Sequence, residues 1–374
     1  MIRILHVFGI MDQGGAENMI MNLYRKIDRS AIQFDFVVHR DSVGFFDAEI
    51  RNLGGRLFYL PSFKGTNIFG YLKEWSKLLD AHPEWTVVHS HIRSTASLLL
   101  FTAKRKGLYT IAHSHSISSG TGIAASAKDI LQYPIRFVAD YFMGCSDEAG
   151  RWLFGKKIIE SARYTTLRNA IDVESFQFSE NTRKAVREKL GYRNGYVVGH
   201  VGRMESPKNH KFLLEVFSLL HTKCPQTDLL LVGSGSLESS VQEYVKENKL
   251  ENSVTILKNR KDVNELLQAM DVFVFPSLYE GLGLAVIEAQ ASGLPVLTTK
   301  DRVPKETAVT DLVEFVPLEN SAEIWSERIL EALKNNKRES PLEEIIEAGY
   351  DIKYTVSWLQ NFYLFAADKV GEEE

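Results

Sequence analysis

The 374-residue sequence contains only two cysteines, Cys145 and Cys224, which stand far apart and show no partner pattern. This scarcity excludes a disulfide scaffold and a cysteine-ligated zinc site, and it fits a reducing compartment. No run of apolar residues is long enough for a membrane span, and the apolar N-terminal stretch lacks a small-residue cleavage site. We therefore expect no secretory signal and a cytoplasmic protein, or one that is peripheral at the inner face of the cell membrane.

Two short motifs are also missing. No Asp-x-Asp occurs, so the sequence has no carboxylate pair of the kind that holds a divalent metal. No Gly-x-Gly-x-x-Gly occurs, which disfavours a nicotinamide dehydrogenase because that fingerprint carries the dinucleotide pyrophosphate. We expect no cofactor and no metal, and nothing in the composition indicates nucleic acid as a partner.

What is present is material for two cores, since 44% of the residues are hydrophobic and the chain is long for one domain. Residues 1–170 hold 21 Lys and Arg against 15 Asp and Glu, a net +6, whereas the remainder has a net charge of −10. A basic first half suits an anionic partner, such as a phosphate-bearing acceptor or an anionic membrane surface. Ordinary variation in surface charge explains the difference equally well.

The order of apolar runs and amphipathic stretches predicts the fold class. Short runs rich in Val, Ile, Phe and Tyr alternate with helix-like stretches, as in a parallel sheet covered by helices on both faces. The alternation restarts after a polar, charged stretch at residues 172–193. We predict an α/β protein with two doubly wound, Rossmann-like domains, residues 1–175 and 176–352. The aromatic segment 353–369 is a helix that either completes the second domain or, as we favour, packs back on the first.

A glycine-bearing loop between a strand and a helix, at residues 276–284, is the first candidate site. Gly281 and Gly283 allow close backbone approach, and the amides of residues 282–284, which include Leu282 and Leu284, suit an anion at a helix N-terminus. Glu280 lies at the mouth of the loop and Glu288 lies on the helix, so the two carboxylates suit the hydroxyls of a sugar and a ribose. The alternative is one surface and one capping glutamate.

Arg203 and Lys208 form the second candidate, in a loop that enters a helix. Two cations there can converge on a diphosphate, because a guanidinium grips two oxygens at once. Alone, the pair is equally consistent with solvated surface charges. Gly233 follows the next strand in a strand–glycine–helix turn that would open space for a nucleotide.

The first half contributes a glycine pair and four histidines. Gly14 and Gly15 separate the first strand from the first helix, and a tight turn with positive φ is the plain alternative to ligand contact. The remaining candidates are histidines at strand ends, where ligands of open α/β sheets bind: His89, His91, His113 and His115. A metal would need a further ligand at fixed spacing, and none is evident, so we expect no metal site. Any one of them could be a satisfied strand-end histidine.

Taken together, these motifs resemble a known family. Glu-x7-Glu after a strand ending in Pro-Ser, followed by Ala-x-Ala-Ser-Gly-Leu-Pro-Val, is similar to the retaining glycosyltransferases of family four, the group 1 transferases. The resemblance covers essentially the whole chain and is greatest to the branch of exopolysaccharide and capsular polysaccharide biosynthesis. It implies a GT-B fold, with two Rossmann-like domains facing across a cleft, and a metal-independent hexosyltransferase that uses a nucleotide-sugar donor, UDP-sugar in our expectation.

The resemblance also implies roles for residues. Arg203 and Lys208 would bind the donor phosphates, Glu288 the ribose and Glu280 the transferred sugar, while backbone groups around Arg260 would read uracil. The remaining implied contacts belong to the first domain: Gly14 and Gly15 to the diphosphate, His113 to the transferred sugar, and His91 and His115 to the acceptor side. The acceptor would be a saccharide, lipid-linked in our expectation. A nucleotide-sugar epimerase of the same fold and a non-catalytic partner in a polysaccharide assembly complex remain alternatives.

The chain departs from the family at one point. Where the family hinge often reads Asn-Gly-Ile-Asp, this sequence has Asn169-Ala170-Ile171-Asp172. Alanine adopts the left-handed region at a higher cost than glycine, so a stiffer hinge is expected.

Overall fold

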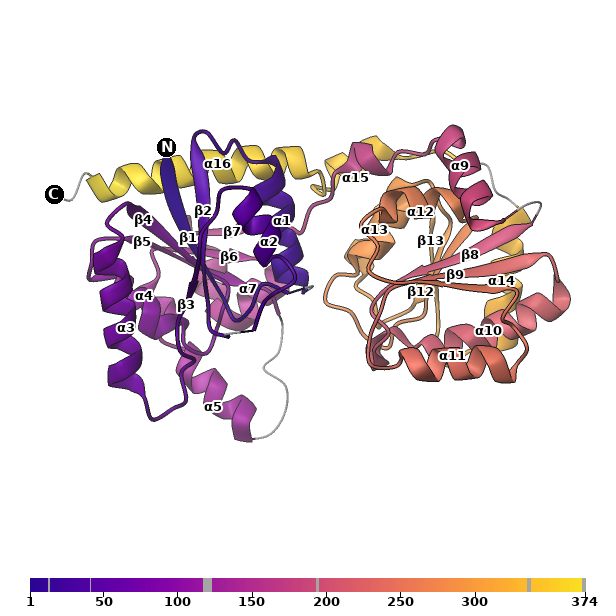
Figure 1. Ribbon diagram of the computed structural model, residues 1–374, viewed down its shortest axis with the longest axis horizontal. Helices are drawn as coiled ribbons and strands as arrows, with labels where there is room; N and C mark the ends of the chain where they lie inside the picture. The colour runs from indigo at the N-terminus through magenta and orange to yellow at the C-terminus, as the bar shows by residue number, and fades with distance from the viewer. Residues whose placement is uncertain (13, 41, 117–122, 193–194, 335–337, 372–374) are drawn as a thin grey trace. The chain divides into compact units, whose positions relative to one another are not determined.

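The computed structural model describes the chain except for residues 13, 41, 117–122, 193–194, 335–337 and 372–374. The chain divides into two compact units (Figure 1). Unit 1 consists of Met1–Ala170 and Ile352–Glu374, and unit 2 is Ile171–Asp351. None of the described helices is long and apolar enough to cross a membrane.

Unit 1 is built on a seven-stranded, fully parallel sheet in the order β3-β2-β1-β4-β5-β6-β7. Its strands are β1 (Ile2–Phe8), β2 (Ile32–Val38), β3 (Leu57–Tyr59), β4 (Trp85–Ser90), β5 (Tyr109–Ser114), β6 (Tyr141–Gly144) and β7 (Tyr164–Thr166). Every residue of β2 is buried, as expected for a strand covered on both faces.

Helices cover both faces of this sheet. Those of unit 1 are α1 (Gly15–Lys26), α2 (Asp47–Asn52), α3 (Ile68–Ala81), α4 (Ala96–Lys104), α5 (Ile123–Gln132), α6 (Ile135–Val138), α7 (Asp147–Phe154), α8 (Lys156–Ile159) and α16 (Ile352–Gly371). One core lies under α1, α2 and α16, and a second core lies on the opposite face under α3, α4 and α7. Figure 1 shows α16, in yellow, running alongside the sheet of unit 1.

The C-terminal helix α16 belongs to unit 1 because of its apolar stripe. Val356, Leu359, Tyr363 and Ala366 recur at helical spacing, and all four are buried in the core that also contains α1. The chain thus leaves unit 1 at Ala170 and returns to it at Ile352.

The hinge alanine has a plain structural explanation. Ala170 is 4% exposed and lies in the core of unit 1, and it is not among the described residues with positive φ. The backbone therefore does not use the left-handed region at the position where the family has glycine.

Unit 2 contains a six-stranded parallel sheet in the order β10-β9-β8-β11-β12-β13. Counted from β8, this is the strand order of dinucleotide-binding Rossmann folds. The strands are β8 (Tyr196–Val201), β9 (Thr227–Val232), β10 (Val254–Leu257), β11 (Val272–Phe275), β12 (Val296–Thr299) and β13 (Val313–Val316). The prediction of two doubly wound, Rossmann-like parallel sheets is confirmed.

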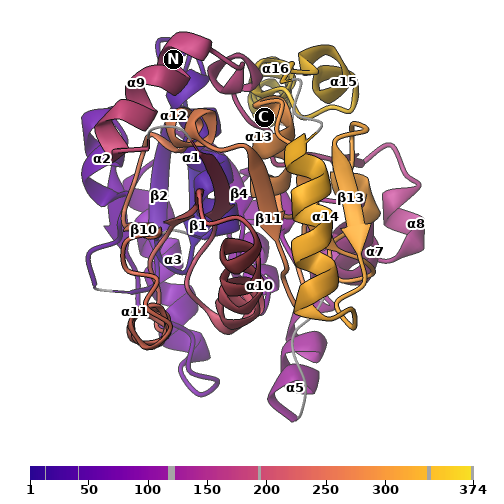
Figure 2. The ribbon, with the colours of Figure 1, turned by 90° about the vertical axis from the view of Figure 1, so that its right-hand side faces the viewer.

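The helices of unit 2 also form two layers. They are η1 (Val173–Phe176), α9 (Glu180–Leu190), η2 (Ser206–Lys208), α10 (His210–Lys223), α11 (Glu238–Glu247), α12 (Val263–Ala269), α13 (Leu284–Ala291), η3 (Lys305–Thr307), α14 (Ala322–Lys334) and α15 (Leu342–Glu347). Helices α10, α11 and α14 cover one core, and α9, α12, α13 and α15 cover the other. Figure 2 shows α10 and α14 side by side on one face of the sheet.

Helix α9 lies within the polar stretch that marked the domain boundary in the sequence. Its anchor is ionic: Arg183 and Arg187 both reach Asp271, which is 4% exposed, at 2.6 and 3.0 Å. Val186 and Arg187 are the buried residues of α9, so few apolar side chains mark this helix in the sequence.

Unit 1 has a corresponding buried carboxylate, Asp35 on β2. Arg3 and Trp85 donate to it at 2.6–2.8 Å, and Arg56 completes the set of donors. Burial alone would raise the pKa of Asp35, but the hydrogen bonds from Arg3, Arg56 and Trp85 outweigh it and hold this pKa well below its usual range. Asp35 therefore stabilises the fold above its unfolded-state pKa, and this stabilisation is lost as the pH falls.

Replacing this carboxylate tests the ionic anchor. Asp35→Asn leaves two arginines facing a neutral amide, and we expect it to lower the free energy of unfolding by about 3–5 kcal/mol at neutral pH. Glu84→Gln is the control, because Glu84 pairs with the exposed side of Arg56 and should cost less than about 1 kcal/mol. Denaturant titration of both variants measures the difference, and equal losses would contradict the assignment.

Candidate functional site

The candidate residues of unit 2 lie where the strand order reverses. Strand β8 pairs with β9 on one side and with β11 on the other, so the helices that follow these strands diverge at their carboxyl ends. Arg203 and Lys208 follow β8, and Glu280 follows β11. The fold itself therefore brings segments some seventy residues apart to one edge of the sheet.

Lys208 and Glu280 form an ion pair in the free protein. The Nζ of Lys208 lies 2.6 Å from Oε1 of Glu280, with 19% and 12% of the two side chains exposed. The same ammonium lies 4.5 Å from the centre of the Phe275 ring. The backbone fixes this pairing, because the amide of Leu278 donates to the carbonyl of Pro207 and joins the two loops. The residues predicted to bind phosphate and sugar are thus direct neighbours.

Arg203 is placed differently. Its side chain is exposed, and its guanidinium makes no hydrogen bond or ion pair with the described residues. The amide of Met204, next along the chain, donates to the carbonyl of Ser234 and fixes the loop. The guanidinium of Arg203 thus presents N–H donors that have no partner among the described residues at the carboxyl edge of the sheet.

Gly233 serves a different purpose from the one the sequence suggested. A Cβ at Gly233 would lie 2.0 Å from the carbonyl oxygen of Gly202, and one at Gly235 would lie 2.4 Å from that of Met204. Both glycines therefore allow the loop after β9 to lie against the loop that carries Arg203. They shape the edge of the sheet, and the space that their missing side chains leave is filled by the neighbouring backbone.

The glycine loop before α13 has the expected conformation. Gly283 has φ of +75° and is the N-cap of α13, which begins at Leu284. Gly281 is exposed, and a Cβ there would meet nothing within 4 Å. Leu282 and the first residues of α13 carry amides that have no acceptor within the helix, and these amides suit an anion.

Glu288 lies one turn into α13 and is partly buried. Burial raises its pKa to about 7, and its carboxylate makes no hydrogen bond with the described residues. A carboxyl group that has a raised pKa and no hydrogen-bond partner is typical of a binding position. Arg260, by contrast, already pairs with Asp262 two residues along, so its side chain is engaged.

In unit 1, Gly14 and Gly15 lie at the start of α1, which follows β1. Gly14 is the N-cap of α1 with φ of −98°, and neither glycine is among those with positive φ. The alternative of a tight turn that needs positive φ is therefore wrong. A Cβ at Gly15 would meet nothing within 4 Å. The N-terminus of this twelve-residue helix lies at the carboxyl end of β1, next to β4, where the order of this sheet reverses.

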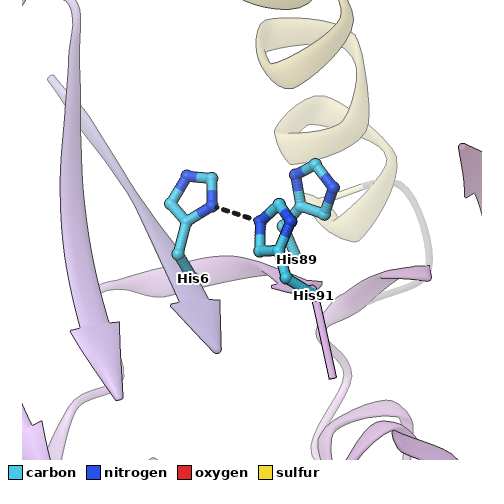
Figure 3. A group of neighbouring side chains, drawn as sticks. All are labelled: His6, His89 and His91. Carbon is cyan, nitrogen blue, oxygen red and sulfur yellow. Dashed lines mark hydrogen bonds between the residues drawn. The ribbon is translucent and has the colours of Figure 1, made fainter. Parts of the chain in front are cut away.

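Five histidines gather at the same edge of unit 1. They are His6 on β1, His89 and His91 at the end of β4, and His113 and His115 at the end of β5. Figure 3 shows three of them, His6, His89 and His91, projecting together from neighbouring strands. His91, His113 and His115, which the sequence singled out, thus lie together. His6, which stands inside an apolar strand and gave no signal of its own, joins them.

The rings are linked by hydrogen bonds in two rows. In one row, Nδ1 of His6 lies 3.0 Å from Nε2 of His91, and Nδ1 of His91 lies 2.8 Å from Nε2 of His115. In the other, Nε2 of His89 lies 3.2 Å from Nδ1 of His113. Burial lowers the pKa of all five, to about 3 for His6 and His115 and well below the usual value for the others. All five rings are therefore neutral at neutral pH.

Neutral imidazoles are also the form that binds metal. Two triads, His6 with His89 and His91, and His91 with His113 and His115, each place one ring nitrogen per residue within 4.8 Å of the others. Such donors suit Zn²⁺. The hydrogen bonds between the rings already use most of these nitrogens, so a metal would have to replace them.

Comparison with known proteins identifies the family. The model of glycosyl transferases group 1 matches residues 182–351, and that of glycosyltransferase family 4 matches residues 13–175. "Putative glycosyltransferase EpsF" of Bacillus subtilis is 35% identical over 98% of this chain and 97% of its own length. The capsular polysaccharide biosynthesis glycosyltransferase CapH of Staphylococcus aureus is 24% identical over 97% of this chain and 99% of its own.

Solved structures show the same fold. Anabaena HepE in complex with UDP and glucose superposes with a TM-score of 0.76 at 16% identity, over 97% of this chain and 99% of that one. The lipopolysaccharide glycosyltransferase WaaG superposes with a TM-score of 0.61 at 18% identity, over 99% of both chains. The chain therefore belongs to the group 1 glycosyltransferases of family four, in the branch of EpsF and the capsular polysaccharide enzymes, and it has their GT-B fold.

Proposed function

We propose that this glycosyltransferase of polysaccharide biosynthesis is a retaining, metal-independent hexosyltransferase that uses a UDP-sugar and a lipid-linked saccharide acceptor. The observation that carries the donor assignment is the edge of unit 2. There the exposed guanidinium of Arg203, the Lys208–Glu280 pair and the first amides of α13 supply cations, hydroxyl acceptors and a helix N-terminus.

The identity of the donor is supported by relatives. HepE is described in complexes with UDP, with UDP and glucose, and with UDP-glucose. A relative from Escherichia coli, 25% identical over 65% of this chain and 66% of its own length, is named UDP-Gal:alpha-D-GlcNAc-diphosphoundecaprenol alpha-1,3-galactosyltransferase. Each of these descriptions names a UDP-sugar, UDP-glucose for HepE and UDP-Gal for the relative from Escherichia coli.

In the proposed reaction the hydroxyl oxygen of the acceptor forms a bond to the anomeric carbon of the sugar as the bond from that carbon to the diphosphate breaks. The hydroxyl proton leaves with the UDP, on which negative charge develops. Arg203, Lys208 and the amides of Leu282, Gly283 and Leu284 would offset that charge. Lys208 is held by Glu280 and the amides are held by the start of α13, and donors in place before the reaction stabilise a developing charge most effectively. No step then requires a divalent metal.

Through its ion pair in the free protein, Lys208 also controls whether Glu280 is available to the sugar. As the diphosphate binds, the ammonium of Lys208 exchanges part of its attraction to Glu280 for the phosphate oxygens. Glu280 is then available to accept hydrogen bonds from the hydroxyls of the sugar. We assign Glu280 to sugar recognition, and His113 to contact with the transferred sugar. Membership of the family supports retention of the anomeric configuration, and the two-carboxylate scheme of glycosidases is not carried over.

A lipid-linked acceptor would require unit 1 to approach a membrane. Exposed aromatic and aliphatic side chains lie along α4, α5 and α6: Phe101, Ile130, Tyr133 and Phe137 are 51–74% exposed. The guanidinium of Arg105 lies 5.8 Å from the ring centre of Phe101, and that of Arg136 lies 4.7 Å from that of Tyr133. Basic residues among exposed aromatic rings suit the interface of an anionic membrane. We name these four side chains the apolar face.

Calorimetry of UDP binding tests the donor site. We expect UDP to bind equally well with and without EDTA, because the cations come from the protein. Arg203→Ala should weaken UDP binding about tenfold or more, as expected for a charge-assisted hydrogen bond worth about 1.5–3 kcal/mol. Arg328→Ala on α14, whose side chain is half exposed, is the matched control and should change nothing. Loss of binding on chelation would contradict metal independence.

The pH dependence of UDP binding tests Glu288. Ribose hydroxyls that donate to its carboxylate favour the ionised form, so the bound state lowers a pKa that is about 7 in the free protein. UDP affinity should therefore rise with pH through about 7 in the wild type. Glu288→Gln should bind UDP more weakly and lack this rise, while titration of the UDP phosphate affects both proteins alike. Parallel pH profiles for the two proteins would remove Glu288 from the ribose site.

Vesicle flotation tests the membrane surface. We expect the protein to bind vesicles that contain anionic phospholipid and to bind zwitterionic vesicles poorly, because the apolar face is accompanied by arginines. Replacing Ile130 and Phe137 with serine should abolish this binding. Phe365→Ser is the matched control, since Phe365 is 52% exposed on α16, which covers the other face of the sheet. Equal binding by all three proteins would show that the apolar face does not dock on lipid.

A further inference from the structure

The hydroxyl of Tyr363 reaches the histidine cluster from the C-terminal helix. It lies 2.7 Å from Nδ1 of His89, and Nε2 of His89 in turn lies 3.2 Å from Nδ1 of His113. All three side chains are at most 1% exposed. They form a continuous row from α16 through β4 to β5, which we call the Tyr363 chain. Nε2 of His113, at its far end, has no hydrogen-bond partner among the described residues.

The direction of the hydrogen bonds along this row follows from the tyrosine. A neutral imidazole donates from one nitrogen and accepts at the other, so each ring passes on the direction set by its neighbour. In the described part of the structure, the hydroxyl proton of Tyr363 has a single acceptor, Nδ1 of His89. When the hydroxyl donates there, the proton of His89 lies on Nε2 and is donated to Nδ1 of His113. The proton of His113 then lies on Nε2.

The opposite direction is disfavoured. If His89 donated to the tyrosine oxygen, the hydroxyl proton would be buried without an acceptor, and His113 would present a lone pair at Nε2. Each direction leaves one buried donor without a partner, the Nε2–H of His113 in the first and the hydroxyl of Tyr363 in the second, but the second also leaves the lone pair at Nε2 of His113 unpaired. One additional buried group without a partner biases the equilibrium by on the order of tenfold. The cationic form of either ring, which would donate from both nitrogens, is also disfavoured, because burial lowers the pKa of both histidines well below the usual value.

We propose that Tyr363 is a positioning residue that fixes His113 in the tautomer with its proton on Nε2. This inference rests on the proposed function, in which His113 contacts the transferred sugar. A fixed N–H donor at Nε2 selects a sugar oxygen that accepts a hydrogen bond, whereas the other tautomer selects a hydroxyl that donates one. The tautomer of a histidine is set by the bond that its other nitrogen makes. For His113 that bond is to His89, which is in turn bonded to Tyr363 on α16.

The neighbouring row of histidines does not supply this function. His6, His91 and His115 are joined to one another, and they meet the Tyr363 chain through ring contacts such as that of His89 with His91, whose centres lie 4.3 Å apart. Figure 3 shows the bond between His6 and His91 with His89 beside it. Stacking transmits no proton preference. Tyr363 is thus the described residue that determines the direction of the bonds to His113.

Nuclear magnetic resonance of the protein labelled with ¹⁵N at histidine reads the tautomer directly. We expect the wild type to show His113 protonated at Nε2, with its signal assigned by its loss in His113→Asn. In Tyr363→Phe the donor to His89 is gone, and His113 should become a mixture of tautomers. Tyr24→Phe is the matched control, because Tyr24 is a fully buried tyrosine of the same core whose hydroxyl bonds to Gln33 instead. It should leave the His113 signal unchanged.

The possible outcomes separate this inference from the proposed function. A wild-type His113 protonated at Nδ1, or an unchanged tautomer in Tyr363→Phe, overturns the role of Tyr363. Metal-shifted histidine signals together with stoichiometric Zn²⁺ in the purified protein also overturn it, in favour of a metal site. Sugar transfer gives the second readout: Tyr363→Phe should lower kcat about tenfold while UDP affinity stays the same. A changed tautomer with unchanged transfer supports the Tyr363 chain and instead removes His113 from the sugar site.

Discussion

Both sheets grow from their first strand in one direction and then reverse. After β1 the next two strands add on one side, and β4 returns to the other, and the same happens around β8 and β11. Right-handed crossover connections place the following helices on opposite faces of the sheet, so the carboxyl ends of the two central strands are left uncovered. Glu280, Lys208, His6, His89 and His91 lie at or just beyond such ends, and His113 and His115 lie at the end of the neighbouring β5. The strand order of each sheet thus determines where the candidate residues lie, whatever their individual side chains are.

The constraint also explains what the sequence could predict. Alternation of apolar runs and amphipathic stretches identified the two parallel sheets, and strand ends next to glycines or charges identified the loops around Lys208 and Glu280. These signals are local, because a few consecutive residues determine them. The partnership of Lys208 with Glu280 is not local, since seventy-two residues separate them and only the strand order brings them together.

Other features left no readable pattern. Helix α9 is held by two arginines on Asp271 and buries a single valine, Val186, so its few apolar residues make it look like a polar linker in the sequence. His6 lies inside a strand that reads as ordinary core, and only the neighbouring β4 turns it into part of a cluster. Gly233 looked like room for a ligand, whereas the structure shows backbone close against backbone. Each of these features depends on contacts between segments that are remote in sequence.

The return of the chain at Ile352 makes unit 1 discontinuous, and this has a consequence for its synthesis. The ribosome completes the seven strands of unit 1, and then the whole of unit 2, before α16 emerges. Until then, the apolar surface of unit 1 that α16 covers in the finished protein stays exposed. The buried histidines also lack their contact with Tyr363. A nascent or prematurely terminated chain can therefore form the sheet of unit 1 but not its finished edge. The histidine row that Tyr363 joins is therefore complete only after α16 has been synthesised.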